Sequence, residues 1–331
     1  MALLEVRGLR TSFFIRSGEL RVVDGIDLDV DEGEVVGLVG ETGSGKSVTA
    51  YSIIGLLKKP GRVVGGEVRW DGRDLRKLSE RTLEHAVRGK EISMIFQSPR
   101  EALNPVIRVG RQITQVLRIK RGMSKEEAHA EAVRLLESVH ISEPEQRLRA
   151  YPHELSGGLA QRIMIALALS SHPRLLIADE PTTGLDVTTQ YQIVQLLREL
   201  RERTGMAILL ITHDLALTAE LCDRLVVCYA GRLAEVGPLE NLVRSPRHPY
   251  TNALLQSRPR VGMTGDIPAI PGNVADLQRP PSGCRFHPRC PNALQVCSEI
   301  QPELEPMVPG QHAACHNPVP VQEEVAAASG R

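Results

Sequence analysis

Residues 40 to 47 read GETGSGKS and match the phosphate-binding pattern G-x-x-x-x-G-K-[ST] at every fixed position. They follow the apolar run 35–39, so the strand, loop and helix context that the pattern needs is present, which argues against an ordinary glycine-rich turn. The glycines allow backbone angles that let successive amides point at phosphate oxygens, Lys46 is expected to reach the β- and γ-phosphates, and Ser47 to bind Mg²⁺. The predicted nucleotide contacts are Gly40, Glu41, Thr42, Gly43, Ser44, Gly45, Lys46 and Ser47.

Two adjacent carboxylates follow another buried run, in the segment RLLIADEPTTGLD. Asp179 stands at the end of the apolar stretch, where a carboxylate can hold the water shell of Mg²⁺. Glu180 comes next, where a second carboxylate can polarise an attacking water molecule. Asp-Glu pairs at strand ends also occur as helix caps, but a phosphate loop upstream favours the catalytic interpretation.

Two further side chains are candidates for the same site. Gln97, in the run ISMIFQSP, can contact Mg²⁺ and report nucleotide occupancy to a neighbouring surface. His213 ends the run ILLITH and can hydrogen-bond a γ-phosphate or the water beside it. Alone, the first is an ordinary exposed glutamine and the second a structural histidine, so both assignments depend on the other motifs.

The segment LSGGLAQR places Ser156, Gly157 and Gly158 at the mouth of an apolar helix expected over 163–169. Backbone amides at a helix start, with the helix dipole behind them, form an anion site. This chain has no second phosphate loop to supply an anion. The segment is therefore interpreted as a γ-phosphate site offered to another subunit.

Hydrophobic patterning predicts the strands that position these residues. Residues 3–9 and 20–30 alternate as antiparallel strands, whereas 34–39, 175–178 and 207–211 are apolar runs typical of buried strands. Polar loops follow the buried runs, at the edge where an open α/β sheet binds its ligand.

The section 100–170 is expected to be helical. Within it, residues 124–139 carry apolar side chains at helical spacing, and Ser124 and Glu127 are placed as a capping box.

Composition sets the remaining limits. The chain has 331 residues, 42% of them apolar, and a net charge of zero, which gives no electrostatic footprint for nucleic acid. The N-terminus does not resemble a signal peptide, and no apolar run approaches the roughly 20 residues that span a bilayer. The chain is expected to be cytosolic by itself, with any membrane role depending on partner subunits.

Six motifs in this order make residues 3–237 resemble the ATP-binding cassette (ABC) ATPases. The resemblance implies an α/β P-loop NTPase cassette with a mixed-sheet core, an N-terminal antiparallel β subdomain and a helical subdomain. In this family's terms, 40–47 is Walker A, Gln97 the Q-loop, 155–161 the signature, 175–179 Walker B, Glu180 the catalytic base, 184–186 the D-loop and His213 the switch histidine.

The same resemblance implies ATP and Mg²⁺ as ligands, with Ser47, Gln97 and Asp179 as the Mg²⁺ ligands and Asp186 at the nucleotide. Phe13 resembles the aromatic residue that stacks on adenine, and Phe14 is the alternative. One position departs from the pattern, because Leu159 stands where the signature usually has glutamine. That departure resembles the peptide-importer branch and leaves the phosphate-binding residues in place.

The C-terminal part differs in composition. Twelve of the 22 prolines lie beyond Arg258, which excludes long helices and predicts a turn-rich lobe with little core of its own, in need of a staple or a partner surface. Residues 240–316 resemble the C-terminal extension of oligopeptide and dipeptide importer ATPases. The expected domains are the ATPase domain at 1–240, the extension at 241–318 and a disordered tail at 319–331.

That resemblance implies the energy-coupling subunit of a peptide importer at the cytoplasmic face of the membrane. It also implies a heterodimer with a second ABC ATPase subunit, two permease subunits and an extracytoplasmic substrate-binding protein. Nickel or another small solute is an alternative cargo. A non-transport ABC ATPase acting on nucleic acid is the alternative from a different class, disfavoured because the chain has no coiled-coil insertion, tandem cassette or basic surplus.

Six cysteines fall into two groups. Cys222 and Cys228 lie in apolar surroundings and are expected to be buried small hydrophobes. Cys284, Cys290, Cys297 and Cys315 lie in the proline-rich lobe, where disulfides are not expected in a reducing cytosol and the paired C-x2-C spacing of structural zinc is absent. Four thiolates suit an iron–sulfur cluster, and the importer resemblance implies a [4Fe–4S] cluster, with zinc or free thiols as alternatives and His287, His312 and His316 as spare ligands.

Overall fold

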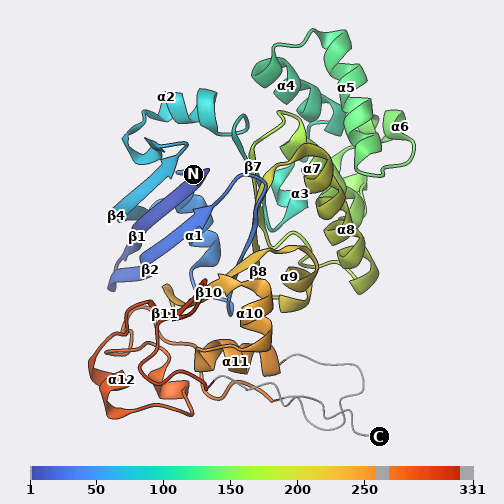
Figure 1. The fold of residues 1–331 in the computed structure, drawn as a ribbon. Helices are drawn as coiled ribbons and strands as arrows, with labels where there is room; N and C mark the ends of the chain where they lie inside the picture. The colour runs from blue at the N-terminus through green and yellow to red at the C-terminus, as the bar shows by residue number, and fades with distance from the viewer. Residues whose placement is uncertain (1, 258–267, 321–331) are drawn as a thin grey trace, which may run out of the picture.

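The computed structural model describes residues 2–257 and 268–320. Two β-sheets lie beside an arm of helices, and the C-terminal region packs below the sheets in the view of Figure 1. From residue 321 onward, the tail expected at 319–331 lies outside the described residues.

The larger sheet has eight strands, namely β3 (Val35–Val39), β6 (Ile92–Ile95), β7 (Leu175–Asp179), β8 (Ala207–Thr212), β9 (Arg224–Tyr229), β10 (Arg232–Pro238), β11 (Glu305–Val308) and β12 (Gln311–Ala313). Their order is β11-β12-β10-β9-β3-β8-β7-β6. The strands from β9 to β6 are parallel, and β10, β12 and β11 continue the sheet antiparallel. Every residue of β3, β7 and β8 is buried, as the continuous apolar runs predict.

The smaller sheet is antiparallel and consists of β1 (Leu4–Ile15), β2 (Gly18–Val30), β4 (Gly61–Trp70) and β5 (Arg73–Asp74), in the order β2-β1-β4-β5. The alternation in the sequence predicted β1 and β2, although both strands are longer than the alternating runs. Its buried side chains pack on β3, β8 and helix α1 (Lys46–Ile53) in a common core. The sheet therefore rests on the helix that begins at the phosphate loop.

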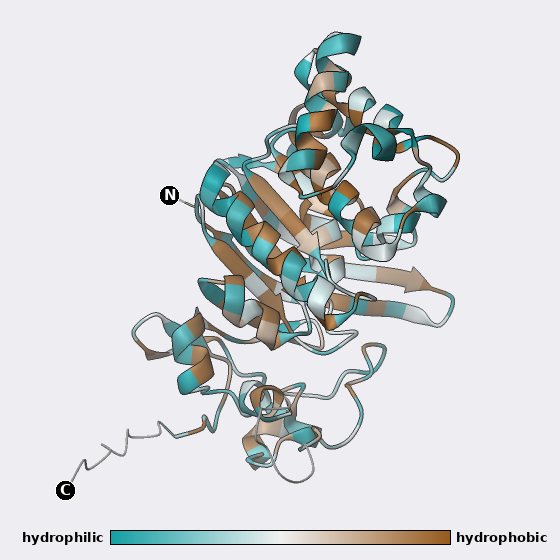
Figure 2. Ribbon diagram, turned by 90° about the vertical axis from the view of Figure 1, so that its right-hand side faces the viewer, coloured by the Kyte–Doolittle hydropathy of each residue, from teal (hydrophilic) through white to brown (hydrophobic). Residues whose placement is uncertain are grey.

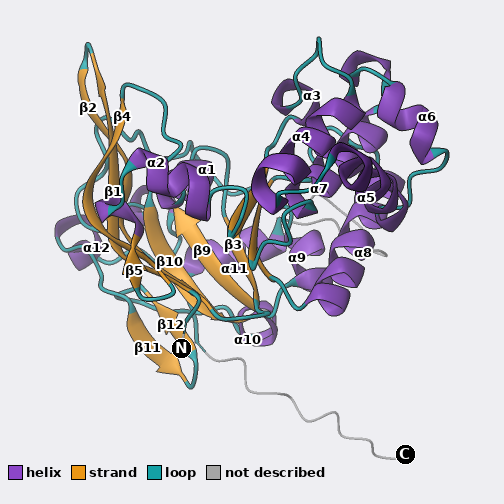
Figure 3. Cartoon of the chain, turned by 90° about the horizontal axis from the view of Figure 1, so that it is seen from above, coloured by secondary structure: helices purple, strands orange, loops and turns teal. Residues whose placement is uncertain are grey.

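The helical arm contains α3 (Pro99–Ala102), α4 (Val109–Arg121), α5 (Lys125–Ser138), α6 (Pro144–Arg149) and α7 (Gly157–Leu169). The predicted capping box is present at the start of α5. The Ser124 hydroxyl accepts a hydrogen bond from the Glu127 amide, and the Glu127 carboxylate accepts one from the Ser124 amide. Figure 3 shows the arm standing beside the sheets. The expected helical subdomain is confirmed.

The remaining α-helices are α2 (Glu80–Thr82), α8 (Val187–Thr204), α9 (Leu215–Leu221), α10 (Leu239–Arg244), α11 (Pro249–Gln256) and α12 (Gln295–Glu299). In the part of the chain that the structure describes, no helix has both the length and the apolar character to cross a membrane. The larger core cluster joins the main sheet to the helical arm and to α11. Figure 2 shows hydrophobic residues, in brown, on the sheet strands and on the helices.

The C-terminal region, expected to need a staple or a partner surface, packs against the cassette. Its strand β12 pairs with β10 and thereby joins the main sheet. Phe286 is buried in the main core cluster together with Tyr229 and Tyr250, and its ring lies 5.2 Å and 5.3 Å from theirs. Of the two expected supports, a staple or a partner surface, the cassette supplies the partner surface.

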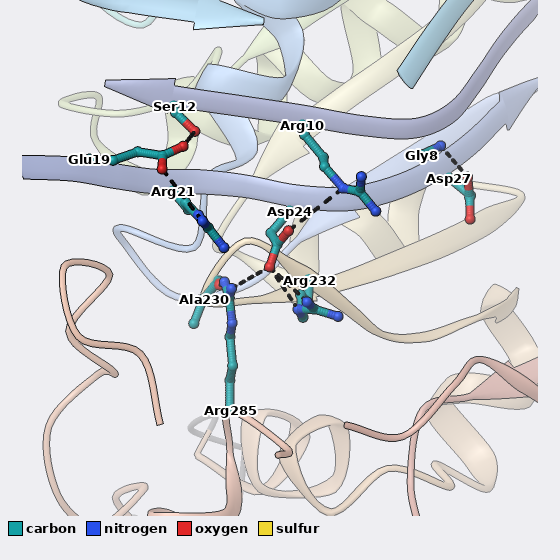
Figure 4. Close-up of polar contacts among 10 residues, drawn as sticks. All are labelled: Gly8, Arg10, Ser12, Glu19, Arg21, Asp24, Asp27, Ala230, Arg232 and Arg285. Carbon is teal, nitrogen blue, oxygen red and sulfur yellow. Dashed lines mark hydrogen bonds and ion pairs between the residues drawn. The ribbon is translucent and has the colours of Figure 1, made fainter. Parts of the chain in front are cut away.

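A partly buried carboxylate ties this region to the smaller sheet (Figure 4). Asp24 of β2 accepts hydrogen bonds from Arg232 of β10 at 2.7 Å and from Arg285 of the C-terminal region at 2.5 Å. Arg285 also donates to the carbonyl of Ala230. Three segments far apart in the sequence therefore meet at one carboxylate.

Candidate active site

The phosphate loop occupies the turn between β3 and α1. Gly40, Gly43 and Gly45 have φ angles of +153°, +83° and +97°, which side chains rarely adopt. Gly40 also has no room for a side chain, because a Cβ there would lie 2.1 Å from the carbonyl oxygen of Cys228. The glycines that the pattern requires are thus explained by backbone conformation and by close packing against the end of β9.

Lys46 points back into the loop. Its Nζ donates to the carbonyls of Gly40 at 2.7 Å and Glu41 at 2.9 Å, and lies 3.4 Å from the hydroxyl of Ser44. The side chain is buried, and burial lowers the pKa of Lys46, against the opposing effect of carboxylates such as Glu180. The loop therefore holds one cation at its centre with its own carbonyl oxygens.

Ser47 and Asp179 meet beside this cation. The Ser47 hydroxyl donates to Asp179 Oδ1 at 2.8 Å, although 132 residues separate the two. Burial raises the pKa of Asp179 to about 6, with the Ser47 hydrogen bond acting in the opposite direction. A hydroxyl and a carboxylate are hard oxygen donors of the kind that Mg²⁺ prefers, so these side chains fit the ion that the sequence implies.

Three side chains converge on Glu180. Gln97 Nε2 donates to Oε2 at 2.9 Å, and His213 Nδ1 lies 3.2 Å from Oε1. The Thr183 hydroxyl donates to Oε2 at 2.8 Å. The Glu180 backbone has a φ of +46°, an uncommon conformation for a residue with a side chain. The structure therefore brings together the predicted base, the predicted Q-loop glutamine and the predicted switch histidine.

Electrostatics keep Glu180 ionised. Burial acts to raise its pKa, but hydrogen bonds from Thr183 and His213 outweigh burial, so the net pKa is lowered. The carboxylate is 11% exposed, whereas His213 is 54% exposed. A general base must be unprotonated to accept a proton, and this site provides that state at neutral pH.

The signature segment lies at the start of α7, which begins at Gly157 and thus earlier than the predicted 163. The Ser156 hydroxyl accepts the Leu159 amide and caps this helix. A Cβ at Gly157 would meet Leu185 at 3.3 Å, and one at Gly158 would meet Thr189 at 2.9 Å. Within its own chain, the signature segment therefore packs beside the D-loop.

Asp186 and the two aromatic candidates are also placed. Asp186 caps α8, with Oδ1 accepting the Thr189 amide at 3.0 Å. Phe13 is half-buried, and its ring leaves no room for a side chain at Gly61. Phe14 is 47% exposed, with the Arg62 guanidinium 5.7 Å from its ring centroid.

The cysteines divide as expected in part. Cys222 and Cys228 are buried, as expected of small hydrophobic packing residues. Burial raises the pKa of the Cys228 thiol to about 12. Burial also raises the pKa of Cys315 to about 12, with the other three thiols of the C-terminal region adding to the effect. Across residues 2–257 and 268–320, however, no three His, Cys, Asp or Glu side chains are grouped to hold a metal ion. The expected [4Fe–4S] site is therefore not supported by the arrangement of the thiols.

Sequence reasoning missed three residues at this site. Thr183 lies in the same loop as Glu180, where a hydroxyl three residues beyond a candidate base was a usable signal. Arg289 and Tyr250 contact Glu41 from 248 and 209 residues away. No local pattern marks residues that reach the loop only through the fold.

Comparisons with known proteins agree with this geometry. The profile of the ABC transporter family matches residues 23–183, and that of the oligopeptide/dipeptide transporter C-terminal region matches 234–297. The oligopeptide transport ATP-binding protein OppD of Salmonella typhimurium is 48% identical over 96% of this chain and 94% of its own length. The dipeptide transport ATP-binding protein DppD of Escherichia coli is 45% identical over 96% of this chain and 98% of its own.

Solved structures show the same fold. The dimeric ATP-binding cassette MJ0796, in a post-hydrolysis state bound to ADP and Pi, superposes with a TM-score of 0.65 and 29% identity. It covers 71% of this chain and 98% of its own. The phosphate loop, the carboxylate pair and near full-length similarity lead to one conclusion: this chain belongs to the ABC transporter family of ATPases, among the oligopeptide/dipeptide transport ATP-binding proteins.

Proposed function

We propose that this chain is the ATP-hydrolysing, energy-coupling subunit of a membrane importer for dipeptides or oligopeptides. The observation that carries the proposal is the convergence of Gln97, Thr183 and His213 on Glu180, beside the Ser47–Asp179 pair. The peptide cargo is supported by relatives named for oligopeptide and dipeptide transport, which match this chain over nearly its whole length.

The side chains divide the hydrolytic step between them. Glu180 accepts the proton of the attacking water, and His213 and Gln97 hold the two oxygens of its carboxylate in place. Lys46 stands in the loop to pair with phosphate oxygens, and Ser47, Gln97 and Asp179 are the residues to hold Mg²⁺. When bound, the ion neutralises charge on the phosphates.

Hydrolysis is further proposed to need a second ATPase subunit. Ser156, Gly157 and Gly158 pack beside their own D-loop, and the related cassette MJ0796 is dimeric. The signature of each subunit, with Asp186, then completes the ATP site of the other. Ser156→Arg should abolish turnover in the assembled complex while the chain alone still binds ATP. Loss of ATP binding by the chain alone would count against the arrangement between subunits.

The remaining partners follow from the same proposal. They are two permease subunits, an extracytoplasmic substrate-binding protein and, for this chain, a place at the cytoplasmic face of the membrane. Phe13 is proposed to stack on adenine. The ATPase domain is proposed to span residues 1–240, and the importer-specific extension residues 241–318. The matched C-terminal profile supports the second range.

Reconstitution tests the cargo. The complex that co-purifies with this chain from membranes is placed in vesicles, and ATP hydrolysis is measured with di- and oligopeptides or with nickel salts. Peptides should stimulate hydrolysis and accumulate inside, and Glu180→Gln should abolish both effects. Stimulation by nickel without any response to peptides would replace the proposed cargo by the metal.

An iron–sulfur cluster on Cys284, Cys290, Cys297 and Cys315 remains a separate proposal. Its support is that the thiols of Cys284, Cys290 and Cys297 add to the burial that raises the pKa of Cys315. Against it stands the absence of a grouped donor set among the described residues. Protein purified without oxygen should contain iron and acid-labile sulfide in near-equal amounts, and Cys290→Ser should lose both. Stoichiometric zinc without iron would identify a zinc site instead.

A further inference from the structure

The C-terminal region contacts the phosphate loop directly. Arg289, one residue before Cys290, donates from Nη1 to Glu41 Oε2 at 2.7 Å and from Nη2 to Glu41 Oε1 at 3.1 Å. Two parallel bonds of this kind fix both the distance and the orientation of a carboxylate. Glu41 is the second residue of the phosphate loop, so an element 248 residues away holds the loop by its side chain.

Tyr250 of α11 holds the backbone of the same residue. Its hydroxyl accepts a hydrogen bond of 2.8 Å from the Glu41 amide. The Glu41 carbonyl in turn accepts a hydrogen bond of 2.9 Å from Lys46 Nζ. The amide, carbonyl and carboxylate of Glu41 therefore all have partners, two of which come from outside the nucleotide-binding motifs.

Arg289 is itself rigidly placed. Its side chain is 5% exposed, and its guanidinium lies 5.7 Å from the ring centroid of Tyr229 and 5.9 Å from that of Phe286. Its Nε donates to the Pro271 carbonyl at 2.8 Å. Hydrogen bonding to Glu41 raises the pKa of Arg289, so the charge is permanent. A side chain fixed at both ends can transmit a displacement of the C-terminal region to the loop.

A second contact reinforces the first. Arg285 donates to the Ala230 carbonyl, and the next residue, Gly231, donates its amide to the carbonyl of Ser44 in the phosphate loop at 2.8 Å. Figure 4 shows Arg285 extending upward from the C-terminal region toward this turn and Asp24. The segment that contains Cys284 and Cys290 therefore contacts the loop directly at Glu41, and through the Ala230–Gly231 turn at Ser44.

We propose that Arg289 and Tyr250 are positioning residues of the ATP site, which hold Glu41 so that the phosphate loop is organised around Lys46 before ATP binds. The proposal rests on the proposed function, because it assigns a further role at the same ATP site. It makes the C-terminal region a part of the nucleotide site: a change that displaces Arg289 alters ATP affinity, and ATP binding reciprocally stabilises the position of Arg289.

The test separates binding from turnover. In the assembled complex, Arg289→Gln should raise the KM for ATP about tenfold with kcat within about twofold of wild type, and the full chain alone should show the same loss of ATP affinity. Arg289→Lys keeps the charge but not the two parallel bonds, and should recover part of the loss. Tyr250→Phe removes only a hydroxyl and should weaken ATP binding less.

The double variant of Glu41→Gln and Arg289→Gln decides whether the Arg289 contact acts through Glu41. If it does, Arg289→Gln adds little to the loss already caused by Glu41→Gln. Ser282→Ala is the matched control, because it removes a 2.6 Å hydrogen bond to the Ser298 carbonyl within the same region without touching the loop. ATP affinity should stay at the wild-type value in this control.

Three outcomes would overturn the inference: unchanged ATP affinity in both Arg289→Gln and Tyr250→Phe, an equal loss in Ser282→Ala, or fully additive losses in the double variant. Failure of the wild-type chain to bind ATP would instead contradict the proposed function. Should Arg289→Gln fail to fold, Tyr250→Phe still carries the test, because it keeps the buried ring.

Discussion

The catalytic edge and the C-terminal region are built in opposite ways. At the catalytic edge, Lys46, Asp179 and His213 stand at or just beyond the ends of adjacent buried strands, so a regular sheet positions them. In the C-terminal region, the longest element within 268–320 is the five-residue helix α12, and single side chains such as Arg285 and Phe286 anchor the chain to the cassette. The first region therefore gains its geometry from secondary structure and the second from docking.

The two modes of construction have different weaknesses. The backbone at the edge of a sheet keeps its geometry when one polar side chain is lost. A substitution there should therefore change the rate of hydrolysis more than it changes stability. A docked segment depends on a few buried arginines and aromatic rings, and removing one partner of a buried pair leaves the other charge uncompensated. Substitutions in the C-terminal region should therefore act on stability and binding rather than on turnover.

The largest expected effect tests the chemical side of this comparison. Glu180→Gln removes the base and should lower the rate of ATP hydrolysis by about 10²- to 10⁴-fold in the assembled complex. Equilibrium binding of a fluorescent ATP analogue should be retained, whereas Lys46→Ala should weaken that binding. Hydrolysis at close to the wild-type rate in Glu180→Gln would show that another group is the base.

Phe286→Ala tests whether the C-terminal region is docked or autonomous. Phe286 is 2% exposed, and truncation of a buried phenylalanine costs about 3–5 kcal/mol. The only tryptophan, Trp70, is buried in the smaller sheet, so its fluorescence reports unfolding of the cassette. We expect the urea midpoint measured by Trp70 fluorescence to fall in Phe286→Ala.

Ile300→Ala is the control in the same region, because Ile300 is 56% exposed and its truncation should change the midpoint little. A Trp70 transition that stays at the wild-type midpoint in Phe286→Ala would mean that the C-terminal region unfolds independently. The contrast between docking and autonomy would then fail.

A smaller effect concerns His248, which caps α11 by accepting the Tyr250 amide. Burial lowers the pKa of His248 to about 4, so the unfolded chain binds a proton between pH 6.5 and 4 that the folded chain does not. Stability should therefore fall as the pH drops through this window, by about 2 kcal/mol at pH 5.

The measurement is the difference in urea midpoint between pH 7 and pH 5, followed by Trp70 fluorescence. His248→Asn keeps an acceptor for the helix cap but has no proton to bind, and should show a smaller difference than wild type. His153→Asn, at an exposed histidine, should behave as wild type. An undiminished difference in His248→Asn would assign the acid sensitivity to other groups.

Much of the fold was predictable where the chain carries local signals. The apolar runs predicted β3, β7 and β8, and the spacing of Ser124 and Glu127 predicted the start of α5. The start of α7 was placed too late, because Gly157 and Gly158 disfavour a helix and only the Ser156 cap reveals that it begins there. The C-terminal region was expected to need a staple or a partner surface, but the sequence did not identify that surface, since nothing local to β12 indicates its pairing with β10.

The phosphate loop, the Asp179–Glu180 pair and the family could be predicted from the amino-acid sequence, because glycine conformations and residue spacings are local properties. The shared contact of Gln97 and His213 with one carboxylate became visible in the folded chain, as did the contacts of Arg289 and Tyr250 with Glu41. The physical reason is distance along the chain: contacts between residues 33 to 248 positions apart are set by how sheets, helices and loops pack, and no periodicity encodes them.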